Sequence, residues 1–118
     1  MMKRTEARRR ALQALFQLDS TELTIEEAMQ HALAVDEETE AKTNAFFEQL
    51  VRGTTENLEA IDASLNEKLE NWTLGRLPKI ERTILRLSVY ELKFANDAPS
   101  KVVLNEAIEL CKLYRDKK

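Results

Sequence analysis

The sequence predicts an all-α fold, and three observations support this prediction. Only 2 glycines and 2 prolines occur among the 118 residues, so few positions favour a tight turn. Residues of high helix propensity, above all alanine, leucine, glutamate, lysine and arginine, dominate the composition. Apolar residues make up 43% of the chain, recur at helical spacing and argue against disorder. The length suits one domain with a core of its own.

A first helix is expected from about Lys3 to Leu18. Its core-facing stripe consists of Ala7, Ala11, Ala14, Leu15 and Leu18. Arg4 and Arg8 extend the same stripe toward the N-terminus, where the helix dipole disfavours positive charge. The first ten residues also carry five basic side chains against the single acid Glu6. This pattern favours an anion-binding role over the alternative, which is a frayed and solvated arginine-rich start.

A short second helix is expected between Ile25 and Leu33, because Thr24 and Glu27 form a capping box. The acidic segment 36–40 follows it and is interpreted as a solvated loop.

A long third helix is expected from about Asn44 to Asn71, since one apolar stripe continues through this range. Gly53 lies inside it, where glycine destabilises a helix by about 1 kcal/mol relative to alanine. Either a close helix crossing or a mild kink would explain this glycine. Trp72 then begins a link that divides the chain into two helical halves, residues 1–71 and 72–118, and is expected to plug the joint between them.

The segment 78–94 carries the strongest pattern and is expected to form the central helix. Two neighbouring apolar lines cover more than half of its circumference, so it should be packed on two or three sides. They consist of Ile80, Ile84, Leu87 and Phe94, and of Leu85, Val89 and Leu92. Glu81 and Glu91 fall inside this apolar arc. Because a buried carboxylate is costly unless it is paired, each is expected to face an internal cation or a second molecule.

The C-terminal segment is expected to contain a turn and one more helix. Pro99 lies in the turn at 96–100, and the apolar run 102–104 is too short to classify. Asn105 is a candidate cap for the last helix. Cys111 lies in that helix without a neighbouring histidine and is expected to be a buried structural thiol.

No arrangement typical of catalysis occurs in the sequence. His31, interpreted as a surface residue, is the single histidine, no Cys/His metal set exists, and no Gly-rich phosphate loop is present. We therefore expect no enzyme activity, no metal and no cofactor. No apolar run approaches the roughly 20 residues that span a membrane, and no signal peptide is visible. With Cys111 as the only cysteine, the reducing cytoplasm is the expected location.

Three stretches carry a family resemblance: residues 8–17 (RRRALQALFQ), residues 80–92 (IERTILRLSVYEL), and Pro99 with residues 102–110 (VVLNEAIEL). In this order they resemble the opening helix, the central helix and the next segment of the NusB family of bacterial transcription antitermination factors. The spacing between them also matches, and the resemblance covers essentially the whole chain. The second and third stretches are the more specific ones.

The resemblance implies an all-α fold of two helical subdomains without catalysis. It implies a complex with NusE, a ribosomal protein of the small subunit, and binding of the boxA element in nascent RNA. Such a complex helps RNA polymerase to pass terminators, above all in ribosomal RNA operons. The implied RNA-binding residues are Lys3, Arg4, Arg8 and Arg9, and the implied NusE-facing residues are Phe16 and Glu81. Glu91 would then be the internal acid, hydrogen-bonded in the core.

The family pattern continues with a further helix that opens near a Lys-Phe-Val-Asn-Gly motif, whereas this sequence ends at Lys118. Without that helix, Leu104, Ile108 and Leu113 are expected to be more exposed. Two other functions fit the residues: a helical protein-interaction adaptor that binds no RNA, and the targeting domain of an RNA-modifying methyltransferase, which would need a Gly-rich cofactor domain. Both a monomer and a homodimer are consistent with the family.

Overall fold

The computed structural model describes residues 3–33, 45–69, 74–96 and 98–115, and every regular element within these ranges is helical. The all-α prediction is therefore confirmed. The acidic segment 36–40 and Trp72 lie outside the described residues. The elements are α1 (Arg4–Ser20), α2 (Ile25–Leu33), α3 (Ala45–Glu56), α4 (Leu58–Lys68), the 3-10 turn η1 (Leu74–Arg76), α5 (Lys79–Val89), the π-helical turn η2 (Tyr90–Ala95) and α6 (Ser100–Arg115).

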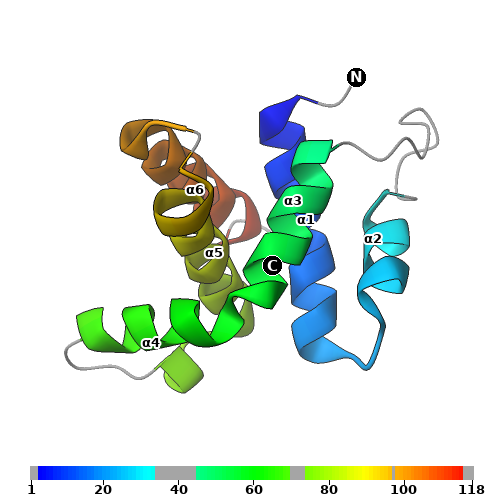
Figure 1. Ribbon diagram of the computed structural model, residues 1–118, viewed down its shortest axis with the longest axis horizontal. Coiled ribbons are helices and arrows are strands. Elements are labelled where there is room, and N and C mark those ends of the chain that lie inside the picture. Colours follow the sequence, from blue (N-terminus) through cyan, green and yellow to red (C-terminus); the bar gives the residue numbers. More distant parts are fainter. Residues whose placement is uncertain (1–2, 34–44, 70–73, 97, 116–118) are drawn as a thin grey trace.

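Helix α1 lies at the centre of the fold. It packs against α2 and α3 and also contacts α5, which in turn packs against α4 and α6 (Figure 1). The predicted stripe of α1 is buried except for its last member, Leu18, which is partly buried, and Ala7, Ala11 and Ala14 are fully enclosed. The predicted capping box starts α2, since Thr24 N–H donates to Glu27 Oε1 at 3.0 Å and Glu27 N–H donates to Thr24 Oγ1 at 3.2 Å. The division into halves at residues 71 and 72 remains a prediction.

The long third helix predicted for 44–71 is wrong, because the chain turns at Asn57 between α3 and α4. The Asn57 side-chain amide donates to Gly53 O at 2.8 Å, and its backbone N–H donates to the same oxygen at 3.1 Å. Asparagine competes in this way with the regular helical hydrogen bonds. The apolar stripe continues across this turn, since Leu50 of α3 and Ile61 of α4 are both fully buried. The stripe alone therefore could not indicate where α3 ends.

Gly53 lies at a close crossing of two helical elements, which was one of the two explanations predicted for this glycine. A Cβ atom at this position would lie 2.2 Å from Cζ of Tyr90 in η2. No side chain fits into such a gap, so glycine allows the Tyr90 ring to lie directly on α3.

The central helix does not keep its α-helical period to the predicted end. From Tyr90 onward it widens into the π-helical turn η2, and Asn96 ends the turn in a left-handed conformation with φ 50°. A wider turn rotates the following side chains away from the α-helical line. Phe94, predicted to share the buried line, is consequently 42% exposed.

Helix α6 begins at Ser100, so Asn105 lies inside the helix and the predicted cap is wrong. Pro99 O accepts the N–H groups of Val102 and Val103 at 3.0 and 3.1 Å, which starts the helix earlier. The predicted burial of Cys111 is also wrong, since this residue is exposed. Only the Val103 side of α6 is covered by the rest of the described chain.

The expected exposure of the other α6 face is confirmed. Leu104 and Ile108 are each 52% exposed, and Leu113 is exposed too. None of the described helices is long and apolar enough to cross a membrane.

Candidate nucleic-acid interface

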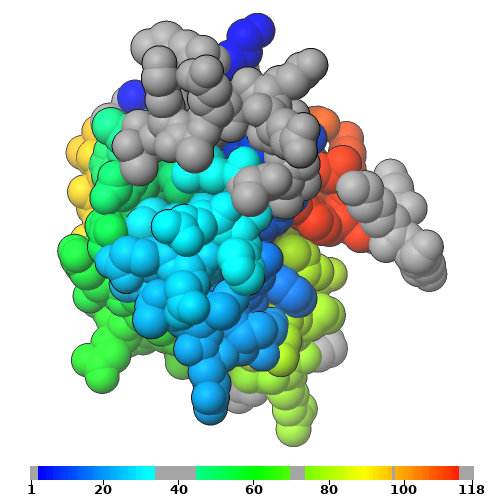
Figure 2. Space-filling model, turned by 90° about the vertical axis from the view of Figure 1, so that its right-hand side faces the viewer, coloured from blue at the N-terminus to red at the C-terminus, as the bar shows by residue number. Residues whose placement is uncertain are grey.

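The basic start of α1 forms the candidate interface. Lys3, Arg4 and Arg9 are exposed, and we call these three residues the exposed cations. No side chain among the described residues caps the first turn of α1, so its backbone N–H groups remain directed outward. Figure 2 shows the dark-blue start of the described chain at one end of the molecule, beyond the cyan surface of α2. Positive side chains and outward N–H groups together favour an anion at this end.

Arg8 lies inside the protein, although it was predicted together with these residues. Its Nε donates to Glu91 Oε1 and Oε2 at 3.0 and 2.8 Å, and its Nη2 donates to Oε1 at 2.9 Å. Both side chains are 3% exposed. The prediction that Glu91 is hydrogen-bonded in the core is therefore confirmed, and its partner is the arginine of the candidate site.

Two further residues complete the surroundings of Arg8. The ring of Phe46, at the start of α3, has its centroid 4.3 Å from Cζ of Arg4 and 5.3 Å from Cζ of Arg8. Glu106 of α6 accepts a hydrogen bond from Thr5 Oγ1 at 3.0 Å and lies 3.9 Å from Arg8 Nη1. Phe46 and Glu106 were not predicted as site residues, because no local pattern in the sequence connects them with the start of α1.

Arg10 has a structural role that sequence analysis did not anticipate. Its Nη1 donates to Ala32 O at 3.0 Å and to Leu33 O at 3.3 Å, which satisfies carbonyls at the end of α2. Its Nε donates to Glu6 Oε2 at 2.7 Å, and Arg9 pairs with the same carboxylate. Partial burial acts to raise the pKa of Glu6, but the hydrogen bonds and charges of the two arginines outweigh it and lower this pKa.

The two predicted partner-facing residues line two neighbouring hollows. Half-buried Phe16 lines one of about 270 Å³ with Ile80 and Tyr114. Exposed Glu81 lines an apolar groove of about 610 Å³ between α5 and α6, together with Leu104, Ile108 and others. Ile80 and Glu81 are consecutive in α5, so both hollows border this helix.

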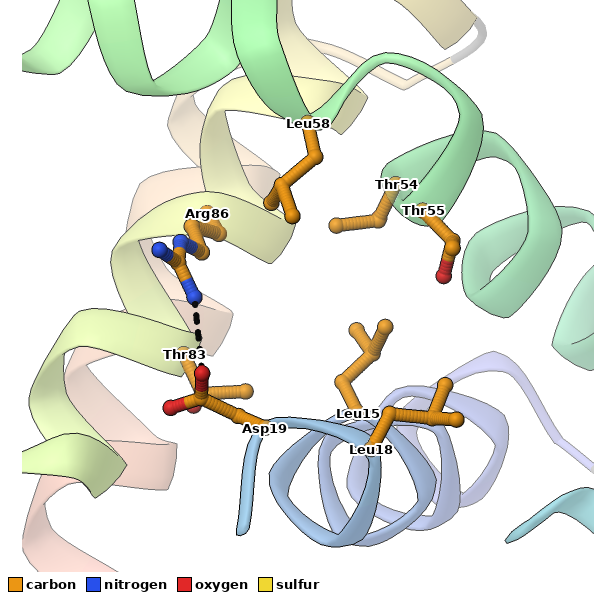
Figure 3. Close-up of a pocket in the computed structure, with 8 residues that line it drawn as sticks. All are labelled: Leu15, Leu18, Asp19, Thr54, Thr55, Leu58, Thr83 and Arg86. Atoms are coloured by element: carbon orange, nitrogen blue, oxygen red, sulfur yellow. Dashed lines mark ion pairs between the residues drawn. The ribbon is translucent and has the colours of Figure 1, made fainter. Parts of the chain in front are cut away.

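A third hollow of about 230 Å³ lies between α1, α3, α4 and α5 (Figure 3). Leu15, Leu18 and Leu58 give it apolar walls, and the Asp19–Arg86 ion pair, with Oδ1 and Nη1 3.5 Å apart, lies at one side. Thr54 also lines it, and its Oγ1 is buried without a hydrogen-bond partner among the described residues. No histidine or cysteine lines this hollow, and the described ranges contain no cluster of acids, histidines or cysteines that could hold a metal ion.

Comparisons with known proteins agree on one family. The profile of the NusB family matches residues 5–118. The chain is 59% identical over 115 residues to the transcription antitermination protein NusB of Lysinibacillus sphaericus and 49% identical over 117 residues to that of Bacillus subtilis. These alignments cover 98% and 99% of this chain and 86% of each relative.

Solved structures share the fold. T. maritima NusB is similar with a TM-score of 0.83 and 34% identity, over 96% of this chain and 79% of that chain. A crystal structure of the antitermination factors NusB and NusE in complex with dsRNA has a TM-score of 0.81 and 29% identity, over 99% and 87% of the two chains.

Proposed function

Since the chain belongs to the NusB family of transcription antitermination proteins, we propose that it is a non-enzymatic RNA-binding factor that acts together with NusE in the cytoplasm. In this proposal it binds boxA-type single-stranded RNA in nascent transcripts, above all of ribosomal RNA operons. The resulting complex joins RNA polymerase and helps it to pass terminators. The solved complex of a related NusB with NusE and dsRNA supports RNA and NusE as partners.

The exposed cations at the start of α1 carry the proposal for RNA. They lie at an uncapped helix start in a chain whose net charge is −3, so the positive potential is local. Phosphate contacts would supply affinity, and bases of the single strand would supply specificity. Arg8 belongs to this site through its buried pair with Glu91, and Phe46 holds the guanidinium groups of Arg4 and Arg8 near one ring.

We place the NusE-facing surface at Phe16 and Glu81. This surface combines the half-buried Phe16 ring on α1 with the exposed Glu81 carboxylate on α5, and each of them lines an apolar hollow. Aromatic anchors in pockets supply much of the energy of protein interfaces. In this arrangement RNA and NusE occupy different parts of the protein, so each could bind while the other is present.

A protein-interaction adaptor without RNA binding is the second candidate. The exposed apolar residues of α6 favour it, since Leu104 and Ile108 lie together along the groove beside Glu81. This candidate predicts binding to a protein partner and no measurable affinity for RNA.

Fluorescence polarisation of a labelled boxA-type RNA, at two salt concentrations and with and without NusE, tests the proposal. We expect salt-dependent binding that NusE strengthens and that a scrambled RNA weakens. Lys3→Ala should weaken binding about fivefold and reduce the salt slope by about 0.7, the value for one phosphate contact on a single strand. Lys68→Ala removes the same charge from the exposed end of α4 and should change neither quantity. Absence of RNA binding with and without NusE would favour the adaptor instead.

A further inference from the structure

A buried carboxylate from a distant part of the chain reaches the start of α1. Glu91 accepts hydrogen bonds from Nε and Nη2 of Arg8 at 2.8 to 3.0 Å, and 83 residues separate the two. Two side chains that are each 3% exposed form this pair. A buried pair is weak as a source of stability, because both ions lose their hydration. Its position beneath the exposed cations therefore points to a role in the interface.

Glu91 is itself held in place by the local backbone. It lies in the π-helical turn η2, and Asn96 N–H donates to Glu91 O at 3.0 Å, which closes the turn. The preceding ring of Tyr90 lies directly on Gly53 of α3. Single π-helical turns are rare and occur often at functional sites. This one fixes the backbone from which the Glu91 side chain reaches Arg8.

Arg8 transmits this restraint to the first two turns of α1. A helix start without a side-chain cap tends to fray, and Lys3 and Arg4 lie in this first turn. Glu106 adds a second connection, since it accepts a hydrogen bond from Thr5 and approaches Arg8. The start of α1 is thus attached to η2 by the buried Arg8–Glu91 pair and to α6 through Glu106.

We propose that Glu91 is a positioning residue of the RNA interface, which acts through Arg8 to hold the exposed cations in one arrangement. This inference rests on the proposed RNA-binding function and assigns to Arg8 a role inside the protein. Cations that are already ordered lose less conformational entropy when phosphate binds. If Arg8 instead left Glu91 to bind phosphate, neutralising Glu91 would release a cation and tighten binding. The two arrangements therefore predict opposite changes in RNA affinity when Glu91 is neutralised.

The test compares Glu91→Gln with Glu109→Gln in the same polarisation assay. Both variants remove one negative charge, but Glu109 is exposed on α6 and remote from Arg8 in every contact that the structure describes. We expect Glu91→Gln to bind the boxA-type RNA about tenfold more weakly than the wild type, because the ordering of the α1 start must then accompany binding. Glu109→Gln should bind as well as the wild type. Equal or tighter binding by Glu91→Gln would overturn the proposal.

Hydrogen exchange supplies a readout that a general loss of stability would not produce. In Glu91→Gln the amides of residues 7–10, the first that donate within α1, should exchange faster, while those in the middle of α3 remain protected. Uniform acceleration throughout the protein would contradict a positioning role. Should Glu91→Gln fail to fold, Glu106→Ala removes the less buried second carboxylate and is expected to weaken RNA binding about threefold; unchanged affinity would overturn the proposal.

The wild type separates this inference from the function on which it rests. If the wild type binds RNA and Glu91→Gln binds equally well, only the positioning role fails. If the wild type shows no RNA binding with NusE present, the proposed function fails and the inference fails with it.

Discussion

Both ends of α1 are joined to the central helical segment by ion pairs, but the pairs differ in burial and in the direction of charge. At the start, the cation Arg8 lies on α1 and its acid Glu91 lies on η2, with both side chains 3% exposed. At the end, the acid Asp19 lies on α1 and the cations Arg82 and Arg86 lie on α5, with the Asp19 side chain 24% exposed. Both charges on α1 oppose the helix dipole, so neither is favoured locally. Each depends on tertiary partners.

The two pairs differ in burial but not in their shortest contact distance. Arg8 Nε lies 2.8 Å from Glu91 Oε2, and Arg82 Nη2 lies 2.8 Å from Asp19 Oδ2. At the buried start, removal of one partner leaves an ion without water or a counter-charge. At the more exposed end of α1 near Asp19, which we call the open end, water replaces the missing partner. Loss of one partner at the start of α1 should therefore lower the free energy of unfolding more than loss of one partner at the end.

The largest expected effect follows directly from this comparison. Arg8→Ala should lower the free energy of unfolding by about 3–5 kcal/mol, because Glu91 then stays buried without a partner. Asp19→Ala should lower it by about 1 kcal/mol or less. Urea unfolding followed by circular dichroism measures both values. Equal losses in the two variants would show that burial does not distinguish the two ends.

A double replacement sharpens the same comparison. Arg8→Met combined with Glu91→Leu removes both buried charges and should recover most of the stability that Arg8→Ala loses. If the positioning role holds, the double variant should still bind RNA less tightly than the wild type, because apolar packing does not fix the direction of α1 as a bidentate pair does.

The next largest effect concerns the contact between Gly53 of α3 and the ring of Tyr90, the residue that precedes Glu91. Gly53→Ala would place Cβ 2.2 Å from the Tyr90 ring and should destabilise the protein by about 1–3 kcal/mol, although alanine is the better helix former. Gly75→Ala is the matched control, since nothing lies within 4 Å of its Cβ position, and it should be nearly neutral. Thermal unfolding of both variants checks this. If Gly53→Ala leaves the stability unchanged, the Tyr90 ring moves aside without destabilising the protein.

The open end of α1 should respond to pH. Partial burial acts to raise the pKa of Asp19, but the hydrogen bond and charge of Arg82 and the charge of Arg86 outweigh it and lower this pKa. A lowered pKa in the folded state stabilises the protein above the ordinary value of about 3.9, and this contribution is lost as the pH falls toward the folded pKa. Urea unfolding at pH 7 and pH 3 should show a loss in the wild type that is about 1 kcal/mol larger than in Asp19→Asn. An equal loss in both would exclude this contribution.

The local features of the sequence predicted the helices well. The alanine and leucine stripe of α1 and the capping box at Thr24 depend on residues within a few positions of one another, and both occur as expected. The turn at Asn57 and the π-helical turn after Val89 were missed. The apolar stripe continues across the first, and no residue type identifies the second. The end of a regular helix depends here on side-chain hydrogen bonds and on packing against a distant helix.

The candidate site was predictable only in part. An excess of arginine at the start of α1 indicated a functional end, and two acids in an apolar arc indicated that each needs a partner. The exposure of Glu81 and the burial of Glu91 are consistent with different partners. The sequence could not show that Arg8 is the partner of Glu91, because only the packing of α1 on η2 brings residues 83 positions apart together. The basic cluster therefore looked uniform, although two of its arginines are buried.

The smallest predicted effect concerns a buried hydroxyl near the open end of α1. Thr54 Oγ1 has no hydrogen-bond partner among the described residues, whereas Thr83 Oγ1, on the same hollow, donates to Lys79 O at 2.7 Å. Thr54→Val replaces the unpaired hydroxyl with a methyl group and should raise the free energy of unfolding by about 0.5–1 kcal/mol. Thr83→Val loses a hydrogen bond and should lower it by up to about 1 kcal/mol. Urea unfolding of both variants measures the difference. A stability loss in Thr54→Val comparable to that in Thr83→Val would mean that water or a partner satisfies the Thr54 hydroxyl in solution.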